Sequence, residues 1–299
     1  MKKEIIDQDN KTGSQITEQF ISLKRILASK NKNLLKVIPK PLLKWFEKII
    51  HLERINRTIY EYRDFKGVSF ATCVLEDIKV DVEVVNPENI PVTGRPLVIS
   101  NHPLGGIDGM ALISEVGKFR SDIVFPVNDI LCKLPGLKDV FIPVNKYGRN
   151  SDNHQALEDA FASDSCMMFF PAGMVSRKQN NIISDLDWKK TFIKKAIEYN
   201  RDIIPVYTDA KNSNFFYRFA NIRKKIGMKF NIELIFLPDE MFKQKGKKIR
   251  LVFGKPIPIE TFDKRFNQKE WADILKQYVY SLAKDPKAEF NIENYLKNQ

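Results

Sequence analysis

The stretch that decides the fold is "VISNHPLGGIDGMALI", residues 98–113. It starts as a short apolar strand, continues through a turn that contains proline and glycine, and ends as an apolar helix. A strand and a helix joined in this way are typical of α/β proteins. The turn accounts for the glycines and the proline, but not for His102, one of three histidines in the chain. This turn is therefore a candidate functional site.

Strand and helix patterns also alternate through the rest of the chain, from about residue 69. Strands are predicted at 79–86, 95–101, 121–127, 140–145, 165–171, 201–207, 230–237 and 248–254. Helices are predicted at 108–119, 153–163, 187–200 and 267–284. The sequence therefore predicts an α/β fold with a mixed, largely parallel sheet that is flanked by helices.

The N-terminal part of the chain has a different composition. Residues 1–15 are polar and are predicted to form a disordered tail, and residues 16–65 are predicted to form a basic amphipathic helical segment. Four residues of this segment are predicted to face a membrane: Lys40, Lys44, Trp45 and Lys48. The alternative is a helix that packs its apolar face on the core and leaves its lysines in water.

The chain carries a large excess of positive charge. Its formal net charge is +12 and its pI is about 9.4, which favours a polyanionic partner: an anionic membrane surface, a nucleic acid or a phosphate-bearing cofactor. No nucleic-acid-binding motif accompanies the charge, so no nucleic acid partner is expected. Neither a signal peptide nor a run of roughly 18 apolar residues occurs, so any membrane contact is expected to be peripheral.

The three cysteines indicate a reducing environment. Cys73, Cys132 and Cys166 lie in or beside apolar runs and lack the spacing of metal ligands. They are predicted to be buried thiols, and no metal site is predicted. A cytoplasmic location fits this cysteine usage.

Polar residues that could perform chemistry follow the predicted strand at 95–101. Asn101, a candidate substrate-binding residue, and His102 lie at its end, and Asp108 opens the next helix. Alone, Asp108 could be a helix cap and His102 a histidine bonded within its own loop. Together, a carboxylate beside an imidazole fixes the tautomer and leaves the second ring nitrogen as a general base. Gly105 and Gly106 would allow a tight turn and a close approach by substrate.

Two further strands end in residues suited to anions. Lys146 and Arg149 follow the strand at 140–145, and they are either a solvated turn or a grip for a phosphate. The strand at 165–171 is followed by a loop whose backbone amides and cation suit an anion. Its candidate substrate-binding residues are Pro171, Gly173, Ser176 and Arg177.

These stretches, in this order, resemble the conserved blocks of the lysophospholipid and glycerol-phosphate acyltransferase superfamily. The blocks are "NHPLGGID", "VFIPVNK", "FFPAGMVSR" and "IIPVY", and the match spans about residues 96–258. The chain looks most similar to the bacterial hemolysin-like branch, which is similar to the acyltransferases that complete ornithine or glycine aminolipids. The resemblance implies a glycerol-phosphate acyltransferase-like fold, with an acyltransferase domain at residues 66–299.

The resemblance also implies the reaction and its partners. A fatty acyl group would move from a thioester of acyl carrier protein or coenzyme A to the hydroxyl of a lyso-lipid. His102 would deprotonate the hydroxyl and Asp108 would orient His102, with no bound cofactor and no acyl-enzyme. The enzyme would be a peripheral protein on the cytoplasmic face of the inner membrane. Two alternatives are a non-catalytic basic protein that binds lipid or nucleic acid, and a lipid hydrolase that uses His102 on water.

The chain departs from the family pattern at several positions. Five residues separate His102 from Asp108 where the family has four, so the loop must bulge to bring the pair together. Val144 stands where the second block usually has arginine, and Ala172 stands where the third block usually has glutamate. These changes favour an acceptor other than lysophosphatidic acid.

Overall fold

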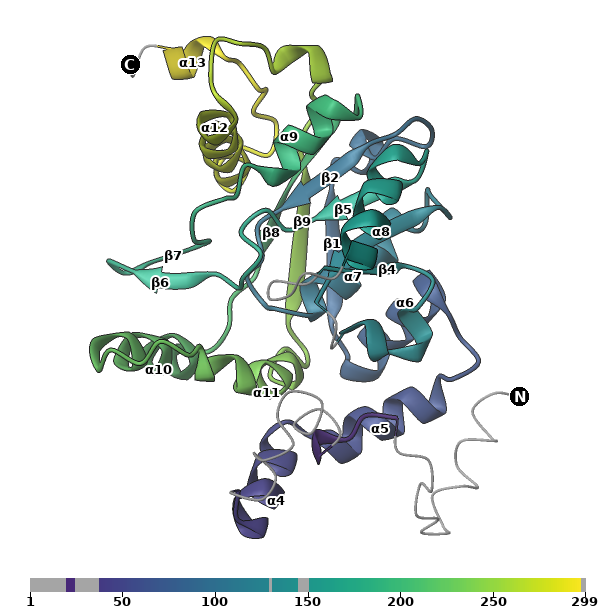
Figure 1. Ribbon diagram of the computed structural model, residues 1–299, viewed down its shortest axis with the longest axis vertical. Helices are drawn as coiled ribbons and strands as arrows, with labels where there is room; N and C mark the ends of the chain where they lie inside the picture. The colour runs from purple at the N-terminus through teal and green to yellow at the C-terminus, as the bar shows by residue number, and fades with distance from the viewer. Residues whose placement is uncertain (1–19, 25–37, 129–130, 145–150, 297–299) are drawn as a thin grey trace.

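A seven-stranded sheet forms the centre of the protein in the computed structural model, which describes residues 20–24, 38–128, 131–144 and 151–296 (Figure 1). Its strand order is β1-β9-β8-β2-β5-β3-β4. Every neighbouring pair is parallel except β8 and β9. The strands are β1 Asp81–Val85, β2 Leu97–Ser100, β3 Ile123–Val127, β4 Phe141–Pro143, β5 Cys166–Phe169, β8 Ile203–Asp209 and β9 Lys248–Phe253. The predicted mixed, largely parallel sheet is confirmed.

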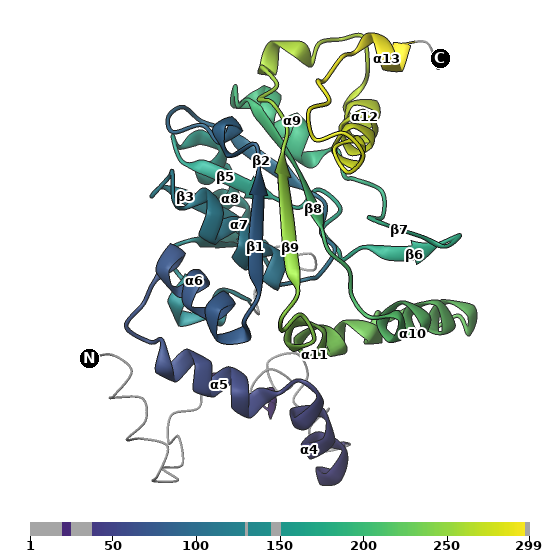
Figure 2. The same ribbon diagram turned by 180° about the vertical axis from the view of Figure 1, so that it is seen from behind.

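Helices cover both faces of this sheet because its strands are apolar on both faces. In β2, Val98 packs into one core cluster, whereas Leu97 and Ile99 pack into the other. The first cluster is covered by α5 (Leu52–Glu61), α6 (Gly67–Ile78) and α7 (Ile107–Val116). The second is covered by α8 (Ser151–Ala162), α9 (Thr191–Glu198) and α12 (Gln268–Ser281). Figure 2 shows the same layers from behind.

One predicted strand is wrong. Residues 230–237 form the 3₁₀ helix η4 (Ile232–Phe236), which leads into α11 (Leu237–Phe242). Glu233 is fully buried between Arg177 and Arg223 in this arrangement. A local apolar run does not by itself distinguish a strand from a short helix, and here Glu233 of η4 forms ion pairs with both arginines.

Two elements that the sequence patterns did not predict lie beside each other. The hairpin of β6 (Arg177–Gln179) and β7 (Ile182–Ser184) is antiparallel, and its turn uses Asn180 and Asn181 at positive φ, as a two-residue hairpin turn requires. The helix α10 (Asn214–Lys225) packs against β6.

The N-terminal helix α4 (Lys40–Ile49) lies where the sequence predicted it. Leu43 is its one buried residue, while Leu42 and Trp45 are 41% and 50% exposed. The helix therefore exposes Leu42 and Trp45, while Phe46 and Ile49 are half-buried. His51 joins α4 to α5 with a left-handed backbone and bonds Asp239 of α11 at 2.8 Å.

The remaining elements are short. These are the 3₁₀ helices η1 Pro87–Asn89, η2 Leu131–Lys133, η3 Pro135–Leu137 and η5 Ile259–Thr261, and the C-terminal helix α13 Glu293–Leu296. None of the helices within the described ranges has the length and apolarity needed to cross a bilayer. Cys166 is buried in β5, and Cys73 and Cys132 are half-buried. The predicted tail, residues 1–15, lies outside the described residues.

Candidate active site

The candidate site lies at the carboxyl ends of three neighbouring strands. β2 is paired with β5 on one side and with β8 on the other, and all three run parallel. Loops that follow parallel strands meet at one edge of a sheet. The block that contains His102 follows β2, and the "FFPAGMVSR" block follows β5. The fold therefore brings together segments about 70 residues apart in the sequence.

His102 and Asp108 form the predicted pair. Nδ1 of His102 lies 2.9 Å from Oδ2 of Asp108, and a carboxylate only accepts, so Nδ1 carries the proton. Asp108 is fully buried and accepts four further hydrogen bonds from backbone amides. These donors are Leu104 and Gly105 to Oδ2, and Gly106 and Gly109 to Oδ1, at 2.9–3.3 Å. The carboxylate is held by five donors in all.

These five hydrogen bonds keep Asp108 ionised although it is buried. Burial acts to raise the pKa of Asp108, but the charge of His102, its hydrogen bond and the loop amides outweigh burial and lower the pKa below its usual value. Asp108 is the second residue of α7, and Gly106 is the N-cap. The carboxylate thus folds back onto its own loop, where it orders the imidazole.

The five-residue spacer bulges as the sequence required. Gly105 adopts a φ of +87°, and a Cβ there would lie 2.7 Å from Val175 and 2.8 Å from Leu237. A side chain at Gly105 would therefore be strained by the backbone conformation and would displace Val175 and Leu237. A Cβ at Gly106 would meet nothing within 4 Å. The open space beside Gly106 is consistent with the predicted approach of substrate at this residue.

The ring of His102 is held from a second side. It stacks on Phe170 with ring centroids 3.9 Å apart and an angle of 19° between the planes. Within the described residues, Nε2 makes no hydrogen bond. With Nδ1–H donated to Asp108, Nε2 carries the lone pair and can accept a proton.

Asp185 is a site residue that the sequence reasoning missed. Its Oδ1 accepts hydrogen bonds from the backbone amide of His102 (3.1 Å) and from the hydroxyl of Ser176 (2.5 Å). Its Oδ2 accepts from the indole of Trp188. Burial raises the pKa of Asp185, against these hydrogen bonds. Asp185 therefore links the loops that follow β2 and β5. Its only signal in the sequence is its position three residues before Trp188.

The side chains of several predicted substrate-binding residues form hydrogen bonds within the protein. Asn101 exchanges two hydrogen bonds with the backbone of Thr208 in β8. Ser176 is buried on Asp185, and its amide donates to the carbonyl of His102 at 2.8 Å. Arg177 donates to Glu233 at 2.8 Å and to its own loop. These contacts position the site, and direct contact of these residues with substrate stays a prediction.

Four other predicted residues complete the comparison. Pro171 is buried and its carbonyl accepts from Lys189. Gly173 has a φ of 59° and its amide donates to the carbonyl of Phe170. Lys146 and Arg149 lie outside the described residues. Their predicted grip on a phosphate stays a prediction.

The site defines a class of enzyme. A buried Asp–His pair with one ring nitrogen available is suited to remove a proton from a hydroxyl. The hydroxyl of Ser176 donates its hydrogen bond to Asp185, and burial raises the pKa of the Cys166 thiol to about 12. Neither side chain is therefore suited to act as the attacking nucleophile. The fold and the site together describe an α/β protein whose His102–Asp108 pair is suited to general base catalysis.

Comparison with known proteins places the chain more narrowly. The model of the acyltransferase family matches residues 25–288. The lyso-glycine lipid O-acyltransferase of Bacteroides thetaiotaomicron is 43% identical over 265 residues, 88% of this chain and 97% of that protein. The protein of the same name from Phocaeicola vulgatus is 41% identical, over 88% of this chain and 95% of its own length. The chain belongs to the acyltransferase family, which confirms the resemblance and the prediction of an acyltransferase enzyme.

A solved structure also overlaps with this fold. The 1-acyl-sn-glycerophosphate (LPA) acyltransferase PlsC from Thermotoga maritima matches with a TM-score of 0.45 and 16% identity, over 90% of this chain and 95% of that one. Overlap at this level says nothing about the substrate of this chain.

Proposed function

We propose that the protein transfers a fatty acyl group from an acyl thioester to the hydroxyl of a lyso-lipid, with a lyso-glycine lipid as the preferred acceptor. The observation on which this rests is the His102–Asp108 pair, which leaves Nε2 as a base. The relatives that share over 40% of their residues with this chain are named for that acceptor. The donor is a thioester of acyl carrier protein or coenzyme A, with no bound cofactor.

The reaction needs one base and no covalent enzyme intermediate. Nε2 of His102 takes the proton of the acceptor hydroxyl while that oxygen attacks the thioester carbonyl. The tetrahedral intermediate expels the thiolate, which receives the proton back from the imidazolium. The products are an ester and a thiol. Asp108 stays ionised throughout and stabilises the imidazolium.

The membrane part of the proposal concerns α4. Lys40, Lys44 and Lys48 are exposed, as is Trp45, and an exposed tryptophan beside lysines suits the interface of an anionic bilayer. Each lysine would add about 1 kcal/mol of attraction. Acyl carrier protein and coenzyme A thioesters are cytoplasmic, so we place the protein at the cytoplasmic face of the inner membrane.

The experiment is an acyl-transfer assay with purified protein, anionic vesicles and either donor. The acceptors are a hydroxyacyl glycine and lysophosphatidic acid, and both the ester product and the released thiol are measured. His102→Ala is expected to abolish ester formation with its melting temperature unchanged. His154→Ala, at an exposed histidine, is the matched control and is expected to keep full activity.

Two results would overturn the proposal. Full ester formation by His102→Ala would remove the base. Release of thiol at the same rate without any acceptor would make the enzyme a hydrolase.

A further inference from the structure

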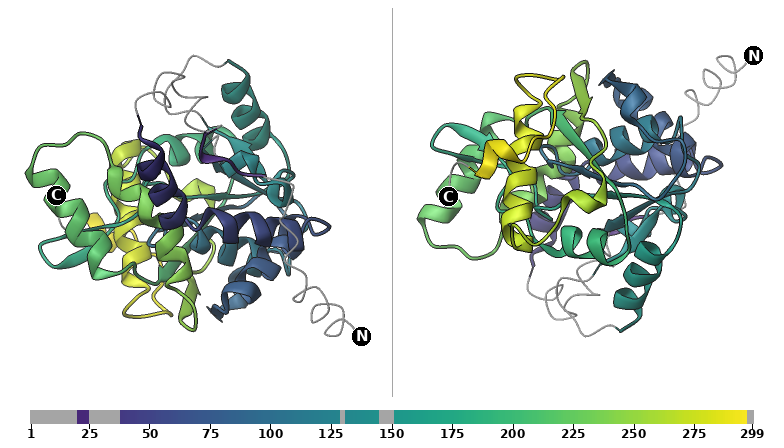
Figure 3. Two further views of the ribbon diagram at one scale, coloured as in Figure 1. Left: turned by 90° about the horizontal axis from the view of Figure 1, so that it is seen from below. Right: turned by 90° about the horizontal axis from the view of Figure 1, so that it is seen from above.

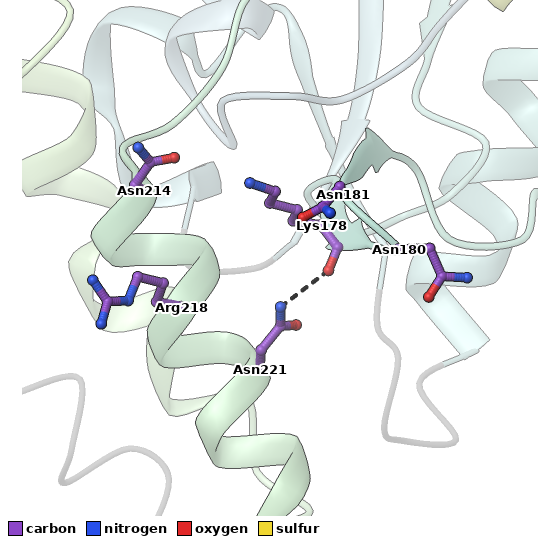
Figure 4. Close-up of a pocket in the computed structure, with 6 residues that line it drawn as sticks. All are labelled: Lys178, Asn180, Asn181, Asn214, Arg218 and Asn221. Carbon is purple, nitrogen blue, oxygen red and sulfur yellow. Dashed lines mark hydrogen bonds between the residues drawn. The ribbon is translucent and has the colours of Figure 1, made fainter.

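A cavity of about 520 Å³ lies between the β6–β7 hairpin and α10 (Figure 4). Its lining contains two cations and four carboxamides and no carboxylate: Lys178, Arg218, Asn180, Asn181, Asn214 and Asn221. Lys178 reaches from β6 toward the first turn of α10, where Asn214 lies, and the amide of Asn221 donates to the carbonyl of Lys178. The lining suits a ligand that joins an anion to an amide.

Both walls of this cavity are attached to the catalytic loop. Lys178 comes two residues after Ser176, whose amide donates to the carbonyl of His102. Asn214 comes two residues after Asn212, whose side-chain amide donates to the carbonyl of Pro103 at 3.1 Å. Two residues of extended chain span about 7 Å. Each wall is therefore connected to the loop of His102 by two residues of chain and one hydrogen bond.

We infer that this cavity binds the carboxylate head group of the acceptor, with Lys178 as the main cation. The inference rests on the proposed function. An acylated glycine ends in a carboxylate joined to an amide, which matches the cation and the carboxamides of the lining. A hydroxyl on the third carbon of its acyl chain lies about two residue lengths, roughly 7 Å, from the carboxylate. The inference requires the hydroxyl to reach His102 while the carboxylate occupies the cavity.

The test compares two acceptors that differ only in charge. They are N-(3-hydroxyhexadecanoyl)glycine and its primary amide, assayed with wild-type protein, Lys178→Gln and Lys178→Arg. Removal of a charged hydrogen bond is expected to lower kcat/KM for the carboxylate relative to the amide by about tenfold or more in Lys178→Gln, and Lys178→Arg is expected to restore much of the ratio. Lys284→Gln, at an exposed lysine, is the control and keeps the wild-type ratio.

Each outcome separates the inference from the proposed function. An unchanged ratio in Lys178→Gln, with wild-type transfer intact, overturns the inference and leaves the function standing. No transfer by the wild type to either acceptor overturns the function. If Lys178→Gln raises the KM for acyl-coenzyme A and leaves the KM for the acceptor unchanged, the cavity binds the phosphates of the donor. That result would also overturn the inference.

A second feature is the exposed surface of α10, of η4 and of the loop between them, residues 214–236, called here the basic arm. It exposes six large apolar side chains: Phe215, Ile222, Ile226, Met228, Phe230 and Ile232. Phe230 is 83% exposed and Ile226 is 67% exposed. Four exposed cations accompany them, namely Arg218, Lys224, Lys225 and Lys229, and the single acidic residue of the arm, Glu233, is buried.

The basic arm lies at the same end of the molecule as α4. Figures 1 and 2 show α4, α10 and α11 at this end, and the left view of Figure 3 looks onto it. His51, at the end of α4, bonds Asp239 of α11. Clustered apolar side chains rimmed by cations mark an interaction surface, and the charge selects an anionic one. We propose that the arm is a second membrane-docking element that inserts into an anionic bilayer.

The test measures sedimentation with vesicles of phosphatidylglycerol and phosphatidylcholine, and with phosphatidylcholine alone. Ile226→Ser with Phe230→Ser is expected to weaken binding to both by about tenfold or more. A triple variant is expected to weaken binding to the anionic vesicles alone, by at least tenfold. It changes Lys224, Lys225 and Lys229 to Gln. Val92→Ser, at a valine that is 65% exposed, is the control. Unchanged binding of both arm variants, or a change in oligomeric state without loss of binding, overturns the proposal.

Discussion

Replacement of Asp108 by Asn tests the catalytic geometry most directly. The carboxylate accepts five hydrogen bonds, two at Oδ1 and three at Oδ2. An amide has one acceptor oxygen, so either the two donors at Oδ1 or the backbone donors at Oδ2 must face an NH₂ group. If the NH₂ group faces His102, the imidazole must change tautomer so that Nδ1 accepts the hydrogen bond. The proton then lies on Nε2, which can no longer act as a base.

The magnitude follows from these contacts. Each buried donor left without an acceptor costs about 1–3 kcal/mol, so the variant should lose roughly 2–6 kcal/mol of stability. For a domain of this size, that is a fall in melting temperature on the order of 10 °C. The loss of the carboxylate or of the correct tautomer should lower kcat by about 10³–10⁴.

The pH dependence of stability has a definite sign. The pKa of Asp108 is lowered in the folded protein, so its contribution is present above the unfolded pKa near 4 and is lost as the pH falls through the folded pKa. The stability gap between wild type and Asp108→Asn should therefore be constant near pH 7 and narrow below about pH 4.

The assay combines thermal melting, urea unfolding at several pH values, and acyl-transfer kinetics at 25 °C. Asp64→Asn, at an exposed aspartate, controls for the change of charge. A variant Asp108→Asn that keeps a tenth or more of the wild-type kcat, with an unchanged melting temperature, would show that the carboxylate neither orients the base nor holds the loop.

Other variants test other parts of the site. Gly105→Ala should lower the melting temperature and the activity, because a Cβ there meets Val175 at 2.7 Å, whereas Gly106→Ala should melt like the wild type and raise the KM for a substrate. Equal melting of the two variants would contradict this. Glu233→Ala should cost about 3–5 kcal/mol in urea unfolding, because it leaves the buried Arg177 and the half-buried Arg223 without their carboxylate partner; a loss below 1 kcal/mol would refute it. Trp45 is 50% exposed, so its fluorescence should shift to the blue with anionic vesicles, and an unchanged spectrum would place α4 away from lipid.

The sequence by itself predicted the seven strands of the central sheet, the helices α4, α7, α8, α9 and α12, and the His102–Asp108 pair. These features depend on local spacing, because alternating apolar residues and the turn from 101 to 107 are properties of neighbours in the chain. The pair of His102 and Asp108 was predictable for the same reason, since one short loop holds both residues.

The tertiary structure alone decided which candidate side chains are held by contacts within the fold. Arg177 looks like an anion ligand in the sequence, but its guanidinium is bound by Glu233, 56 residues away. Asp185 carries no strong local signal, yet it holds the backbone of His102 across 83 residues. The cavity and the basic arm also arise from segments distant in the chain. Burial and ion pairing between such segments follow from packing, and local periodicity does not encode them.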